Sequence, residues 1–170
     1  EMYNASNKSK FISYDSLKEL LKSTSQDNVV DLGILNTPFQ AINYSEENPS
    51  QGGLTLNTIT NKFEQISGKN PFLTLQTTVI SPLKDYVKGK NITFNIKNEL
   101  YFKNNYKNIK SLTADFSDGI TRTIINNGVL SNQSIIVNYT SGGKKTLIFN
   151  VTYDDNTTLT SYGEIYLKYS

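Results

Sequence analysis

Two acidic pairs are the residues of this chain best suited to chemistry. Asp115 and Asp118 lie within the stretch DFSDG, and Asp154 and Asp155 are adjacent in a later DDNTT. Paired carboxylates can act as acid and base on a glycosidic bond, bind Ca²⁺ through oxygen ligands, or only shape a tight turn. Which of these three interpretations holds decides the functional class.

The chain contains no histidine and no cysteine. A Ser-His-Asp triad, a Cys-His pair, a disulfide and a His- or Cys-ligated zinc site therefore cannot be assembled from this chain alone. An enzyme would have to use a carboxylate pair or a Ser-Lys arrangement. The missing histidine thus narrows the enzyme classes more than any other feature of the composition.

The stretch DFSDG is best explained as a turn between two strands. Gly119 can adopt the positive φ that a hairpin turn requires, and Asp118 can accept a hydrogen bond from a downstream amide. A hairpin tip offers no cleft that would raise the pKa of one carboxylate, so catalysis by Asp115 and Asp118 is not expected. Calcium remains the alternative: Asp115, Asp118, Asp154 and Asp155 could converge on one ion if the fold brings their two loops together.

Length and charge limit the remaining classes. A chain of 170 residues with 36% hydrophobic content can bury one main core. Its 17 basic and 15 acidic residues are scattered and leave a net charge of +2, which argues against a nucleic-acid groove. No apolar run approaches the roughly 20 residues that cross a bilayer. We expect one main domain with no nucleic-acid partner and no membrane span.

Residues 1–71 are expected to form an irregular N-terminal segment with one short helix near residues 13–23. Ser16 and Glu19 form a capping box, and Leu17, Leu20 and Leu21 make a narrow apolar stripe. From residue 26 to 71, the Pro-, Gly- and Asn-rich stretches NTPFQ, EENPSQGG and SGKNPF indicate an irregular segment with one or two short strands or turns.

Residues 72–170 carry short β-type runs separated by turn signals. In NITFNI, for example, Ile92, Phe94 and Ile96 share one face and polar residues share the other. Seven strands are predicted, over residues 72–80, 91–96, 110–116, 121–125, 134–139, 145–153 and 161–169. This alternation is typical of antiparallel sheets with one solvated face. We therefore predict a mainly β fold, an antiparallel β-sandwich.

The order of these motifs resembles the PKD (polycystic kidney disease) domain, an immunoglobulin-like sandwich repeat common in secreted and surface proteins. In that family one strand ends in W-D-F-G-D-G, and a later segment reads roughly Y-T-x-x-G-x-Y-x-V-x-L-x-V-x-D. The first motif is matched here by Asp115, Phe116, Asp118 and Gly119, with Ala114 and Ser117 in place of the aromatic residue and the first glycine. The second is matched by Tyr139, Thr140, Gly143, Leu147, Phe149 and Val151.

The resemblance implies an immunoglobulin/PKD-like sandwich that acts as a non-catalytic spacer, binding or adhesion module in a secreted or cell-surface protein. The irregular leader followed by a sandwich is also similar to non-catalytic front portions of exported proteins from Bacteroidetes-type bacteria. The expected partners are a protein, a polysaccharide or neighbouring domains of the same polypeptide. No cofactor is expected, with calcium as the one alternative. An accessory domain of a secreted hydrolase is an alternative.

Three tyrosines near the last two predicted strands suggest a ligand-binding face: Tyr153, Tyr162 and Tyr166. Aromatic side chains supply rigid contact area and anchor partners. Tyrosine is equally a good strand former on a half-exposed sheet. A carbohydrate-binding face built from these three residues is therefore the second functional alternative.

Overall fold

The computed structural model describes residues 26–45, 51–104 and 106–170, and their regular structure is almost entirely β. The strands are β1 (Val29–Ile42), β2 (Leu54–Asn57), β3 (Lys62–Gln65), β4 (Phe72–Pro82), β5 (Tyr86–Lys88), β6 (Asn91–Ile96), β7 (Tyr101–Lys103), β8 (Ile109–Asp115), β9 (Thr121–Asn126), β10 (Val129–Leu130), β11 (Gln133–Asn138), β12 (Gly143–Tyr153) and β13 (Thr158–Lys168). A short 3₁₀ helix, η3 (Asn98–Leu100), precedes β7. The predicted mainly β fold is confirmed; the helix predicted near residues 13–23 lies outside the described residues.

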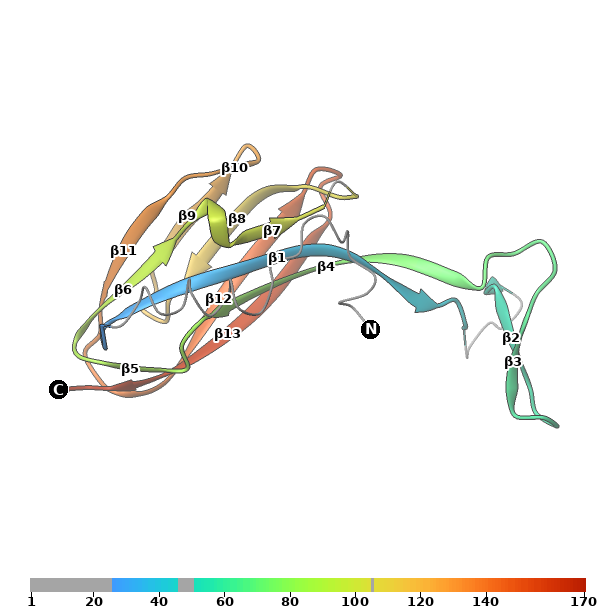
Figure 1. Cartoon of the computed structure of the whole chain (residues 1–170), viewed down its shortest axis with the longest axis horizontal. Helices are drawn as coiled ribbons and strands as arrows, with labels where there is room; N and C mark the ends of the chain where they lie inside the picture. Colours follow the sequence, from blue (N-terminus) through green and yellow to red (C-terminus); the bar gives the residue numbers. More distant parts are fainter. Residues whose placement is uncertain (1–25, 46–50, 105) are drawn as a thin grey trace.

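The strands form two main sheets that face each other (Figure 1). One sheet has the order β11-β6-β1-β4, with β7 also paired to β1, and the other has the order β10-β9-β8-β12-β13-β5. Most neighbouring strands are antiparallel, as predicted. Parallel pairs join β1 to β6, β1 to β7 and β13 to β5, because these neighbours come from distant parts of the chain.

Three phenylalanines connect the two sheets. The ring centroids of Phe94, on β6, and Phe116, which follows β8, lie 4.4 Å apart, and Phe116 lies 6.3 Å from Phe149 on β12 in an edge-to-face arrangement. All three side chains are fully buried. Since β6 and β12 belong to different sheets, these contacts join the inner faces of the sandwich.

All seven predicted strands are present, with boundaries that move by at most three residues. Ile92, Phe94 and Ile96 are buried as predicted, and so are the inner-facing residues of other strands, including Leu112 and Ala114 on β8 and Phe149 on β12. Tyr169 lies beyond the end of β13 and is 40% exposed. The alternation of apolar and polar residues was therefore enough to predict a strand wherever one of its faces meets solvent.

The interpretation of residues 26–71 as irregular was wrong for residues 29–42, whereas the short strands β2 and β3 agree with it. Residues 29–42 form β1, the longest strand, and its residues Val30, Leu32 and Ile34 lie in the core. Gly33 and Pro38 interrupt the sequence and look like breakers, but β1 lies between β4 on one side and β6 and β7 on the other. These tertiary pairings hold it extended. The division predicted between residues 71 and 72 therefore separates β1 from β4, although these two strands pair with each other.

Strands β1 and β4 pair over their whole shared length, from Leu32 opposite Pro82 to Ile42 opposite Phe72. The part near Leu32 and Pro82 lies in the sandwich. The other part, residues 37–42 and 72–77, leaves the sandwich as a two-stranded ribbon that ends at the β2–β3 hairpin (Figure 1). We call this ribbon the arm.

The aromatic contacts of the core predict a large loss of stability on truncation. Phe149→Ala should lower the free energy of unfolding by about 3–5 kcal/mol, because it removes a fully buried ring between the sheets. The matched control, Ile136→Ala, truncates a side chain that is 62% exposed and should change stability by no more than about 0.5 kcal/mol. Urea unfolding measures both, and equal losses would contradict this account of the core.

Candidate functional site

Exposed tyrosines gather on the outer face of the six-stranded sheet. Tyr162 and Tyr166 alternate along β13 with the buried Ile165 and Leu167, so both point away from the core. Their side chains are 67% and 54% exposed. Tyr86 on β5 is 49% exposed and lies directly opposite Tyr166 in the parallel β13–β5 pair. We call Tyr86, Tyr162 and Tyr166 the tyrosine ledge.

Two rings of the ledge are aligned by the strand pairing. The ring centroids of Tyr86 and Tyr166 lie 6.0 Å apart with their planes at only 8°. Tyr86 was not predicted, because β5 has only three residues and its partner strand lies far along the chain. No local pattern reveals such a long-range parallel pair.

Polar groups lie beside the ledge on the same face. Lys144 and Glu164 form an ion pair of 3.3 Å, and Glu164 occupies the outward position between the two tyrosines of β13. Two residues before Tyr162 on β13, the hydroxyl of Thr160 donates a hydrogen bond of 2.9 Å to the side-chain oxygen of Asn150 on β12. Exposed aromatic rings and exposed hydrogen-bonding groups therefore lie together on this face.

Tyr153 does not belong to the ledge. It is 2% exposed, and its hydroxyl lies 2.7 Å from that of Thr78 on β4. Burial raises the pKa of Tyr153 above its ordinary value. Because Tyr153 shares the core-facing side of β12 with Phe149 and Val151, its alternation alone could have excluded it from an exposed face.

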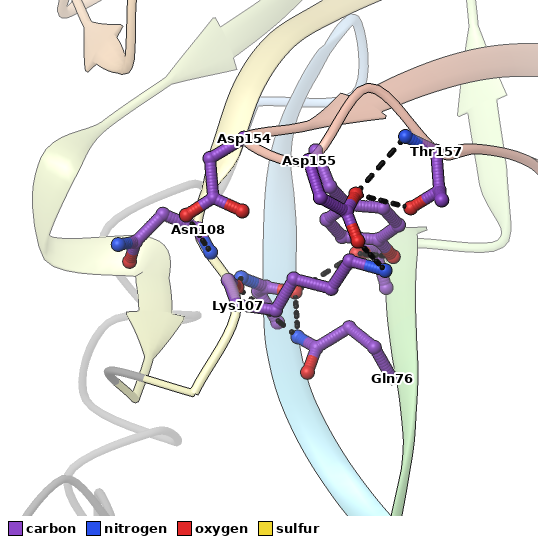
Figure 2. A network of polar contacts seen from close by, with 9 residues as sticks. Gln76, Lys107, Asn108, Asp154, Asp155 and Thr157 are labelled. Atoms are coloured by element: carbon purple, nitrogen blue, oxygen red, sulfur yellow. Dashed lines mark hydrogen bonds and ion pairs between the residues drawn. The ribbon is translucent and has the colours of Figure 1, made fainter.

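A polar network fixes the hairpin between β12 and β13 to the sandwich (Figure 2). Lys107 Nζ lies 2.9 Å from Asp155 Oδ2 and 4.8 Å from the centre of the Tyr153 ring. Asp155 Oδ1 accepts hydrogen bonds from the backbone N–H of Thr157 at 3.0 Å and from its hydroxyl at 2.5 Å. These hydrogen bonds from Thr157 and the contact with Lys107 lower the pKa of Asp155 to about 2.

The same network continues under the hairpin to the point where the arm begins. The carbonyl of Lys107 accepts a hydrogen bond of 2.8 Å from the side-chain amide of Asn36 on β1. Gln76 on β4 contacts both that carbonyl and the Asn36 side chain (Figure 2). Asn36 is fully buried and Thr78, which also donates to it, is 2% exposed, so these two buried side chains find partners here, whereas Gln76 Oε1 is buried without one among the described residues.

The stretch DFSDG forms the turn predicted for it. Asp115 Oδ1 accepts hydrogen bonds from the backbone N–H groups of Ser117 at 2.9 Å and Gly119 at 3.3 Å. Gly119 has a φ of 77°, as expected, and Ser117 also adopts a positive φ, of 68°. A positive φ is unfavourable for serine, and the hydrogen bonds from the Ser117 and Gly119 amides to the Asp115 carboxylate offset this cost.

Asp118 and Arg122 form the second contact of this turn. Arg122 donates to the two carboxylate oxygens of Asp118 at 2.6 and 3.1 Å, a bidentate geometry. These side-chain hydrogen bonds lower the pKa of Asp118. The turn is also anchored to the core, since the hydroxyl of Tyr139 donates to the carbonyl of Phe116 at 2.6 Å.

The two acidic pairs do not meet. Asp115 ends β8 opposite Ile148, whereas Tyr153, which precedes Asp154, lies opposite Ile109 at the other end of β8. Six residues of extended strand separate these ends by about 20 Å. The predicted convergence of Asp115, Asp118, Asp154 and Asp155 on one calcium ion is therefore wrong. Within residues 26–45, 51–104 and 106–170, no group of three or more acidic, His or Cys side chains is placed to hold a metal ion.

The Asp118–Arg122 contact predicts a defined pH dependence. A lowered folded-state pKa stabilises the fold above the unfolded pKa of about 3.9, and this contribution is lost as pH falls through the folded pKa. Asp118→Asn should therefore reduce Tm at pH 7, and the difference from wild type should shrink below about pH 4. Asp85→Asn, at an exposed loop residue, is the control. A difference independent of pH would contradict the assigned role.

The separation of the acidic pairs predicts no stabilisation by calcium. Each pair already accepts hydrogen bonds within its own loop, so Tm should be the same in EDTA and in millimolar calcium. Thermal unfolding followed by circular dichroism measures this. An increase in Tm with calcium that Asp115→Asn abolishes would show that one loop binds the ion by itself.

Comparison with known proteins adds no relative. No family model matches the chain, and no curated protein matches it. The resemblance to PKD domains therefore rests on the two motifs quoted above, and functional inference rests on the chemistry of the described residues. Among these residues there is no helix with the length and apolar character needed to cross a membrane.

Proposed function

We propose that this protein is a non-catalytic binding module of a larger secreted or cell-surface protein, and that the tyrosine ledge binds a polysaccharide. The observation that carries the proposal is the presence of three exposed tyrosines on one face of two paired strands. Surface tyrosines scattered singly would need no explanation, but aligned rings form a contact area suited to a flat ligand.

The shape of the ledge favours an extended ligand. Tyr162 and Tyr166 are four residues apart on β13, which corresponds to about 13 Å along the strand. Tyr86 stacks against Tyr166 from the neighbouring strand, so the aromatic contact area spans β13 and β5. A linear chain of sugar rings can contact both ends of such a surface, with its hydroxyl groups bonded to Lys144, Glu164 and nearby threonines.

The state of the carboxylates supports a non-catalytic role. Asp118 is held by Arg122, and Asp155 by Thr157 and Lys107, and in both cases the pKa is lowered. A general acid of a glycosidase needs a raised pKa instead. The distance of about 20 Å between the two pairs also exceeds the 5–9.5 Å that a catalytic carboxylate pair requires.

The location in a secreted or surface protein is supported by the PKD-like motifs. Phe116 of the first motif and Tyr139 of the second are joined by the hydrogen bond between hydroxyl and carbonyl, so the two motifs act together in one corner of the sandwich. Burial raises the pKa of Tyr139, which keeps its hydroxyl protonated as the donor.

The proposal is tested by retention on insoluble polysaccharides and on a glycan array. Wild type should be retained by at least one polysaccharide, and Tyr162→Ala or Tyr166→Ala should weaken its affinity by about tenfold, because each removes an aromatic contact. Tyr106→Ala is the matched control, because Tyr106 is 57% exposed but lies outside the ledge. No retention of wild type, or equal losses in all three variants, would rule out the ledge as a glycan site.

A further inference from the structure

Strand β4 presents an unprotected edge along the arm. It is the last strand of its sheet among the described residues, and within the arm it pairs only with β1. Exposed edge strands normally carry a charge, a proline or a bulge that prevents pairing with another chain. Residues 72–79, FLTLQTTV, contain no charged residue, no proline and no glycine. Such a segment is a strong template for a further strand.

The end of the arm also exposes apolar side chains. On one face Phe39 pairs with Leu75 and Ala41 with Leu73, followed nearer the sandwich by Thr37 opposite Thr77. Leu73 and Leu75 are 45% and 42% exposed. The opposite face carries Ile42 opposite Phe72, which are 54% and 50% exposed, and then Gln40 opposite Thr74 and Pro38 opposite Gln76. An open edge and exposed apolar side chains therefore occur on the same ribbon.

We propose that the arm binds a second copy of this chain, with the two β4 edges paired antiparallel about a two-fold axis. In such a pair, the number of a residue in one copy and the number of the residue opposite it in the other copy always add to the same value. When this value is even, odd-numbered residues lie opposite odd-numbered residues, so they share one face of the combined sheet. Leu73 and Leu75 of each copy then lie on the same face of the combined sheet. Because residues 72–79 and the facing residues 35–42 carry no charge, two identical arms meet without like-charge repulsion.

The other edges fit this role less well. The free edge of β1 in the arm contains Pro38, which has no N–H to donate. β11, the other terminal strand of this sheet, has six residues against eleven in β4, and its outward positions Ser134 and Asn138 are polar around Ile136. The arm also projects beyond the sandwich (Figure 1).

Sedimentation velocity over a wide range of concentrations tests the pairing. Wild type should show a monomer–dimer equilibrium, and the double variant Leu73→Lys, Leu75→Lys should weaken dimerisation at least about tenfold, because it places like charges together and removes apolar contacts. Ile136→Lys, on β11, should leave the equilibrium unchanged. Because all these side chains are exposed, the variants should match the Tm of wild type measured at concentrations where wild type is monomeric, which checks that they fold.

Cysteine cross-linking locates the interface. The chain contains no cysteine, so a single Cys placed in turn at residues 72–77 is the only thiol present. Oxidation should give a disulfide-linked dimer whose yield peaks at one position in this range, next to the two-fold axis. Ile136→Cys is the control and should stay monomeric. A wild type that remains monomeric at all concentrations, or cross-linking at residue 136 rather than in β4, would overturn the proposal.

Discussion

The pairing of β1 with β4 is the interaction on which the rest of the structure depends. Within the sandwich, β1 supplies Val30, Leu32 and Ile34 to the core and is flanked by strands on both sides. Beyond the sandwich, the same ladder of hydrogen bonds continues without the support of the second sheet. One strand pair therefore contributes to two different environments, a closed core and a ribbon exposed to solvent on both faces.

The transition between these environments is marked by polar residues. On the core-facing side of β1, the apolar series ends at Asn36, and the facing residue of β4 is Thr78. Both are buried, and both are satisfied by hydrogen bonds with Lys107, Gln76 or Tyr153. The partners of the buried Asn36 amide come from β4 and from the loop before β8. Such an amide is sensitive to geometry, because an unmade bond in a buried site costs about 1–3 kcal/mol. This network thus fixes the position at which the arm leaves the sandwich.

Much of the sandwich could be predicted from the sequence because its strands alternate in polarity. The DFSDG turn could also be predicted, since Gly119 and the two aspartates have local roles. β1 was missed because Gly33 and Pro38 look like breakers and because its extended form depends on tertiary partners. The ledge was half predicted: Tyr162 and Tyr166 follow from alternation on β13, whereas Tyr86 reaches them only through a parallel pair between distant segments. Distances between loops, such as the separation of the two acidic pairs, depend on strand register and cannot be obtained from spacing in the sequence.

The parallel pairing of β5 with β13 makes the ledge depend on two segments that are far apart in the sequence. Tyr86 and Tyr166 can align only after β13 has docked beside both β12 and β5. A chain in which β13 is detached would thus have no aligned rings. Conversely, a ligand held across β5 and β13 would stabilise the attachment of β13, so occupancy of the ledge and docking of this strand are thermodynamically linked.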